Sequence, residues 1–116
     1  MAIRALSGVL LVLLAAPPLL ADARDDARKH VEFGIDVAQR GLWHEAIFQW
    51  ERAIKIDPTY ASAHNNLAIA YEHEGELDKA RAAYEKALEL EPDNALIKQN
   101  YELFKEINDR TSRQAQ

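Results

Sequence analysis

Apolar side chains recur at intervals of three and four residues along most of the chain. This spacing is that of one face of an α-helix rather than that of a strand. The pattern is interrupted by glycine, which can end a helix in the left-handed conformation, and by proline, which cannot continue one. We therefore expect five helices, of which the first four end at Gly41, Asp57-Pro58, Gly75 and Glu91-Pro92 and the fifth covers residues 94–110.

Two consecutive windows of 34 residues carry the same pattern. When residues 27–60 are aligned with residues 61–94, eight positions are identical, and other pairs are conservative, such as Trp50 with Tyr84. Each window predicts one pair of helices, so the chain is expected to form an array in which stacked pairs share a core. Alanine recurs where helices approach closely, at Ala46 and Ala80 within the pairs, and a larger side chain there would force the helices apart.

The repeat resembles the tetratricopeptide repeat (TPR), a helix–turn–helix unit with the pattern W-x2-L-G-x2-Y, A-x3-F and P. The second window reads His64-x2-Leu67-Ala68-x2-Tyr71, then Ala80-x3-Tyr84 and Pro92; the first reads His30-x2-Phe33-Gly34-x2-Val37, then Ala46-x3-Trp50 and Pro58. The resemblance implies an all-α fold, a right-handed α-solenoid over residues 24–110. Its repeats would be residues 27–60 and 61–94, followed by a capping helix at 95–110 and a flexible tail at 111–116.

The resemblance also implies a concave groove that binds another protein or a peptide, lined by the first helix of each repeat. The positions expected to face it are Arg28, Val31, Ile35, Ala38 and Gln39 in the first repeat, Ser62, Asn65, Ile69, Glu72 and His73 in the second, and Gln99 and Leu103 in the last helix. Asn65 and Gln99 are expected to hydrogen-bond a peptide backbone above an apolar floor. The alternative is that these residues line an unused cleft.

Some TPR domains hold a C-terminal carboxylate with a clamp of lysine and asparagine. Val31 and Ile35 stand at the first-repeat positions of that clamp, and Asn66 alone matches it in the second repeat. We therefore do not expect recognition of chaperone tails.

A second candidate surface is marked by Leu42 and Phe48, which stand where the second repeat has Glu76 and Ala82. Exposed apolar side chains can form a contact patch for a partner or for a second copy of the chain. The alternative is that the N-terminal segment folds over them.

Residues 1–23 have the pattern of a secretory signal peptide. Arg4 precedes an apolar run from Ala5 to Ala16, and Ala21-Asp22-Ala23 offers a cleavage site, so we expect cleavage after Ala23. The alternative is an uncleaved membrane anchor over residues 5–21, which is at the short limit for a span. Either interpretation places the repeats outside the cytoplasm. A cleaved signal peptide predicts a periplasmic or secreted protein, and an anchor predicts a membrane-bound one.

Composition narrows the classes of function further. The 116-residue chain has 14 basic and 19 acidic residues, and an acidic chain without a basic stripe argues against nucleic-acid binding. Cysteine is absent, which excludes disulfides and thiolate chemistry. The four histidines form no metal-binding motif, and no catalytic motif is recognisable. We expect no metal, no cofactor and no enzymatic activity.

These observations predict an exported adaptor or scaffold that binds a protein or peptide in its groove, in cell-envelope assembly, secretion or biogenesis. The alternative is a structural module that self-associates and has no dedicated peptide ligand; a homodimer would then be expected. Contact with a membrane is expected only if the N-terminal segment is retained.

Overall fold

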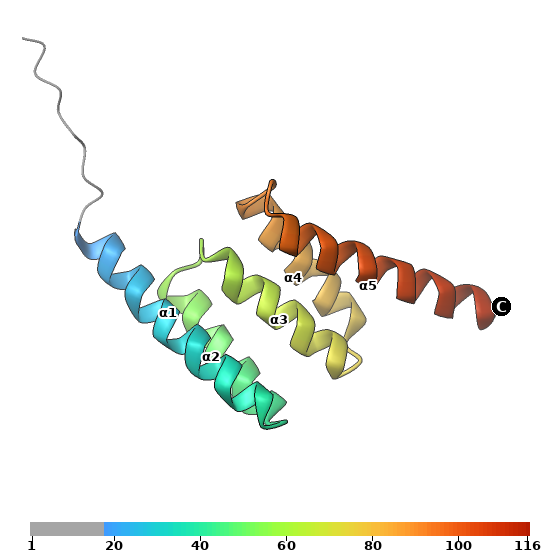
Figure 1. Ribbon diagram of the computed structural model, residues 1–116, viewed down its shortest axis with the longest axis horizontal. Coiled ribbons are helices and arrows are strands. Elements are labelled where there is room, and N and C mark those ends of the chain that lie inside the picture. Colours follow the sequence, from blue (N-terminus) through green and yellow to red (C-terminus); the bar gives the residue numbers. More distant parts are fainter. Residues whose placement is uncertain (1–17) are drawn as a thin grey trace, which may run out of the picture.

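Five α-helices follow one another in a row in the computed structural model, which describes residues 18–116 (Figure 1). They are α1 (Pro18–Gln39), α2 (Trp43–Ile56), α3 (Ala61–His73), α4 (Leu77–Leu90) and α5 (Ala95–Gln114). α1 packs on α2 and α3 packs on α4, and the α2–α3 and α4–α5 contacts join these pairs. The all-α solenoid of two helical pairs and a final helix that the sequence predicts is confirmed.

Glycine forms the turn inside each pair, as predicted. Gly41 and Gly75 have φ angles of 80° and 76°, in the left-handed region that other residues avoid. The amide of Leu42 donates to the carbonyl of Val37 at 3.0 Å, and that of Glu76 donates to Tyr71 at 2.8 Å. These bonds close both first helices in the same way, so the two repeats have the same local geometry at this point.

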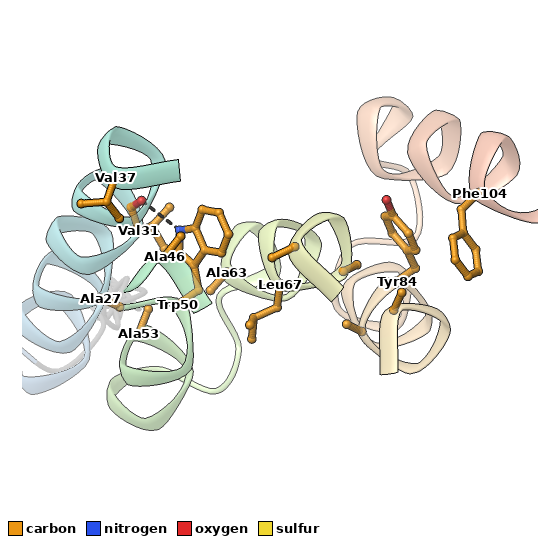
Figure 2. Close-up of a cluster of buried hydrophobic side chains, with 14 residues drawn as sticks. Ala27, Val31, Val37, Ala46, Trp50, Ala53, Ala63, Leu67, Tyr84 and Phe104 are labelled. Atoms are coloured by element: carbon orange, nitrogen blue, oxygen red, sulfur yellow. Dashed lines mark hydrogen bonds between the residues drawn. The ribbon is translucent and has the colours of Figure 1, made fainter. Parts of the chain in front are cut away.

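A tryptophan fills the space between α1 and α2 because a glycine faces it. Gly34 lies so close to Trp50 that a Cβ atom on it would come within 2.7 Å of the indole Cδ1 atom. The buried indole Nε1 donates a hydrogen bond to the carbonyl of Val31 at 3.1 Å (Figure 2). In the second pair Ala68 and Tyr84 take the same two positions, and the Tyr84 hydroxyl donates to Glu72 at 3.0 Å.

Alanine occupies the closest helix contacts, as the sequence predicts. Ala46, Ala53, Ala80 and Ala87 are all fully buried. At the end of the row α5 covers the second pair, where Phe104 is fully buried and its ring centroid lies 5.4 Å from that of Tyr84. Figure 2 shows that this aromatic contact lies at the opposite end of the core from Trp50.

The first helix is longer than the sequence analysis predicted. Within the described residues α1 covers Pro18–Gln39, so it extends towards the N-terminus beyond residue 27, where the first repeat was expected to begin. Arg24 forms an ion pair with Asp57 and a hydrogen bond to Thr59, and it lies over the ring of Tyr60. These contacts hold the beginning of α1 on the α2–α3 connection.

The predicted leader comprises residues 1–23. Residues 1–17 lie outside the described residues, and residues 18–23 belong to α1. Among the described helices, none combines the length and the apolar character needed to cross a membrane.

The last helix is also longer than expected. α5 continues to Gln114, through most of the segment predicted as a tail. The hydroxyls of Thr111 and Ser112 donate to helix carbonyls one turn earlier, which keeps both residues compatible with the helix. Its beginning is as predicted, because the Asn94 side chain accepts hydrogen bonds from the amides of Leu96 and Ile97.

Candidate protein-binding groove

A hollow of about 290 Å³ lies between the first helices of the two repeats. Its lining combines apolar side chains with two amides: Ile35, Ala38, Gln39, Trp43, Trp50, Asn66 and Ile69. Ile35 is 41% exposed, whereas Trp50 is buried beneath it. We call this hollow and the adjoining one described next the α1–α3 groove.

The adjoining hollow, of about 340 Å³, is lined by Trp43, Ile69, Glu72 and His73. It shares Trp43 and Ile69 with the first hollow, so the two hollows adjoin at these residues. The Trp43 ring stacks on the His73 ring, with centroids 4.2 Å apart. Since Trp43 begins α2 and His73 ends α3, this stack links the two repeats at the wall of the groove.

A carboxylate stands at the edge of the groove in a fixed position. Glu72 accepts the hydrogen bond from the Tyr84 hydroxyl, which lies in the core. Burial and the neighbouring Glu72 carboxylate both raise the pKa of Tyr84 above its usual value, which favours the protonated hydroxyl that donates this bond. The groove therefore combines an apolar floor, two amides, one anchored carboxylate and one histidine.

Six predicted residues line this groove: Ile35, Ala38, Gln39, Ile69, Glu72 and His73. Four others line neither hollow, namely Arg28, Ser62, Gln99 and Leu103. Arg28 instead pairs with Asp25 on its own helix, at 3.0 Å. Leu103 is 55% exposed on α5.

Two predicted groove residues are buried instead, and their assignment as displayed side chains was wrong. Val31 is 4% exposed and packs in the core beside Trp50. Asn65 is 6% exposed, and its side-chain oxygen accepts from Asn100 of α5 at 3.2 Å. Both occupy the same position of their repeats, which points towards neighbouring helices, so Asn65 joins α3 to α5 rather than presenting its amide to a ligand.

Three groove residues were not predicted as such: Trp43, Trp50 and Asn66. Asn66 was expected only to match part of a carboxylate clamp, and no role was expected for Trp43. A signal for Asn66 was its spacing, because it lies three residues before Ile69 on the same face of α3, whereas Trp43, the first residue of α2, offered none.

Leu42 and Phe48, the second predicted surface, are both exposed, at 44% and 56%. Phe48 lines a separate hollow of about 310 Å³ together with Phe33, Val37, His44, Glu45 and Gln49, at the outer side of α1 and α2. We call these six residues the end face. Leu42 lies outside this hollow, and Phe33, which is 52% exposed, is a member that the sequence analysis missed.

The histidines that repeat every 34 residues make structural contacts. His30 Nδ1 donates to the side-chain oxygen of Gln49 at 2.7 Å, and His64 Nε2 lies 2.9 Å from the carbonyl of Pro58. Within residues 18–116, no group of three or more histidine, aspartate or glutamate side chains is arranged to hold a metal ion.

Comparison with known proteins agrees with this repeat geometry. A family model described as tetratricopeptide repeat matches residues 61–94, and another described as TPR repeat matches residues 37–75. Type IV pilus assembly protein PilF of Pseudomonas aeruginosa is 37% identical over 86 residues, which are 72% of this chain and 34% of PilF. Chloroplastic tetratricopeptide repeat domain-containing protein PYG7 of Arabidopsis thaliana is 32% identical over 85 residues, 73% of this chain and 28% of that protein.

Protein O-mannosyl-transferase TMTC4 of Mus musculus is 40% identical over 62 residues, which are 53% of this chain but 8% of the transferase. The chain thus spans about a third or less of each of these relatives. What they share with it is the repeat, a unit through which proteins contact other proteins. On the matches of its repeats and on its helical geometry, this chain belongs to the tetratricopeptide repeat family.

Proposed function

We propose that this chain is an adaptor that binds a segment of another protein in the α1–α3 groove. The observation that carries the proposal is the pair of adjoining hollows lined by the first helices of both repeats and by Trp43. Its apolar floor, with Ile35 and Ile69, gains free energy when a ligand removes it from water. The Gln39 and Asn66 amides, which can donate and accept, match the backbone of a bound segment.

The dimensions of the groove indicate the kind of ligand. Hollows of about 290 and 340 Å³ are at the small end of the range for ligand pockets. They suit one or two apolar side chains carried by a peptide segment better than a folded domain. A cationic side chain next to that anchor would meet the Glu72 carboxylate, which adds specificity.

We further propose that the adaptor works in cell-envelope assembly, secretion or biogenesis. The pattern of residues 1–23 supports export, either to the periplasm or medium after cleavage or with an anchor over residues 5–21. One relative is named a type IV pilus assembly protein, which supports a role in building a surface structure. The role is one of binding rather than catalysis.

Site-specific photo-cross-linking in the native host tests the groove. A photoreactive amino acid replaces Gln39 in the full-length chain, and the same substitution at Lys98 on α5 is the control. We expect an adduct with one defined protein from position 39 and none of that mass from position 98. The mass of the recovered chain also shows whether residues 1–23 have been removed.

A second variant links the adduct to the groove chemistry. Ile69→Arg places a charge on the apolar floor, so the adduct from position 39 should be lost while helicity by circular dichroism is kept. An adduct that persists in Ile69→Arg, or that forms equally from position 98, would contradict binding in the groove.

Self-association is the second candidate function, and the exposure of Phe33 and Phe48 favours it. It uses another surface than the groove, so the two functions are compatible.

A further inference from the structure

The end face is apolar in a way that the repeat itself does not require. Phe48 is 56% exposed, and the matching residue of the second repeat, Ala82, is exposed as well. Repeat packing therefore leaves this position in water, and the phenyl ring at 48 contributes nothing to the core there. Phe33 differs, since its counterpart Leu67 is 4% exposed in the interior of the row.

The other end of the row does not complement the end face. α5 lies there (Figure 1), and the positions that correspond to His64, Ala68 and Tyr71 of α3 carry Lys98, Glu102 and Lys105. Stacking α5 of one copy on Phe33 and Phe48 of the next would remove Lys98 and the exposed Lys105–Glu102 ion pair from water against an apolar surface, which is unfavourable. Head-to-tail stacking of copies is thus disfavoured.

The charges around the end face allow two copies of it to meet. On the helical surface Phe33 is flanked by Lys29 and Asp36, and Phe48 by Glu45, Glu51 and Arg52; all five are exposed. Two cations and three anions thus surround the rings, whereas the chain as a whole carries −5. A two-fold arrangement can place the cation of one copy near the anion of the other.

We propose that two copies of the chain form an isologous dimer through their end faces, each inserting Phe48 into the hollow of the other beside Phe33. The hollow of about 310 Å³ is lined by both aromatic side chains, so the same surface supplies the inserted group and the receptacle. Such self-complementarity is what a two-fold interface needs, and it closes at two copies.

The exposed apolar area sets the strength of this contact. An aromatic side chain buries roughly 150–250 Å² in full, so two half-exposed rings in each copy offer roughly 400 Å² of apolar area in the dimer. With its polar rim the interface falls at the low end of specific contacts, below about 1,200 Å². We expect a reversible dimer with a dissociation constant on the order of micromolar or weaker.

A dimer of this kind would carry two α1–α3 grooves. This consequence rests on the proposed binding function of the groove. Ile35, Ala38 and Gln39 line the groove, and Phe33 and Val37 line the end face, so α1 presents different sides to the two surfaces. Both grooves remain accessible in the dimer, which would make the adaptor bivalent and raise its avidity for a repeated or oligomeric partner.

Sedimentation velocity of the protein recovered from its native host tests the dimer, over about two decades of concentration around the micromolar range. We expect a monomer–dimer equilibrium for the wild type. Phe48→Glu should weaken it by about tenfold or more, because it sets two like charges against each other in the contact. Leu96→Glu, which likewise replaces an exposed apolar side chain by glutamate but lies on α5, should leave the equilibrium unchanged.

Three results would overturn the proposal. They are a wild type that is monomeric throughout, a dimer that Leu96→Glu weakens and Phe48→Glu does not, and a partner of another sequence that co-purifies and is lost in Phe48→Glu. If Phe48→Glu loses helicity, its effect on the dimer cannot be interpreted. The arrangement of the two copies is therefore also measured in variants that keep Phe48.

Spin labels provide this independent measurement, because the chain has no cysteine and single-cysteine variants are unambiguous. In the dimer, pulsed electron paramagnetic resonance should give a short distance between copies at Arg40→Cys, beside the end face, and a much longer one at Lys98→Cys on α5. Similar distances at both sites would indicate head-to-tail stacking and overturn the proposal. The photo-cross-link from position 39 in the groove does not depend on Phe48. If the dimer is not found, the test of the groove therefore keeps its meaning.

Discussion

Replacing Gly34 by alanine should destabilise the protein, although alanine is the better helix former. An ordinary Gly→Ala change inside a helix stabilises by about 1 kcal/mol. Here the added Cβ would lie 2.7 Å and 2.8 Å from the Cδ1 and Cε2 atoms of Trp50, where ordinary contact begins at 3.4 Å. The indole ring must therefore move by at least about 0.7 Å within a packed core.

Two costs follow from this movement. Overpacking of a core costs about 1–3 kcal/mol, and loss of the hydrogen bond from Trp50 to the Val31 carbonyl adds about 0.5–1.5 kcal/mol. After the gain in helix propensity is subtracted, we expect a net loss of about 1–3 kcal/mol. For a domain of this size each 1 kcal/mol lowers Tm by about 4–8 °C.

The second repeat provides the matched control. It combines Ala68 with Tyr84 at the same two positions, and both side chains are buried. A methyl group and a smaller aromatic ring thus replace the glycine and the indole of the first repeat. Trp50→Tyr alone should destabilise by leaving a gap, whereas Gly34→Ala with Trp50→Tyr should recover a good part of both losses. A double-mutant cycle by thermal or urea unfolding should therefore give a favourable coupling of about 1–3 kcal/mol. Additive effects, or a stabilised Gly34→Ala variant, would refute the steric argument.

Three other changes test further parts of the fold. Burial acts to raise the pKa of Asp57, but hydrogen bonds from Arg24 and Thr59 outweigh it and hold the pKa below its ordinary value. This contribution to stability is complete above the unfolded pKa of about 3.9 and is lost as the pH falls through the folded pKa. Asp57→Asn should therefore reduce stability at pH 7 and flatten its dependence on pH below about 4, and a wild-type dependence in the variant would contradict this. Asn65→Ala should cost about 1–3 kcal/mol in urea unfolding, because Asn100 loses its partner in a half-buried site, and a neutral result would argue that water replaces the bond. Ala80→Leu should cost about 1–3 kcal/mol at a fully buried helix contact, and an unchanged Tm would show that the α3–α4 pair can open there.

Local features could be predicted because their causes lie within a few residues. The glycine turns at Gly41 and Gly75 depend on a backbone conformation that glycine adopts at little cost. The Asn94 cap depends on an asparagine directly before an apolar run. The 34-residue period added the non-local part, since equal residues in both windows imply equal helix pairs and the buried alanines between them.

The ends of the row were less predictable, because no second copy of the repeat constrains them. Residues 18–26 are mixed in polarity and follow a proline, so periodicity alone does not show that α1 extends over them. Contacts of Arg24 with Asp57 and Tyr60, more than thirty positions away, hold that turn of the helix in place.

The sequence by itself determined the helices, their order and the repeat, because these follow from periodicity and from glycine and proline chemistry; the family followed from the resemblance of that repeat to the tetratricopeptide pattern. Only the tertiary structure decided which sides of α1 and α3 are open to a ligand. Val31 and Ile35 are both apolar and lie one turn apart, yet Trp50 covers the first and leaves the second exposed. That difference depends on how neighbouring helices cross, which is a property of the packed array and not of either helix alone.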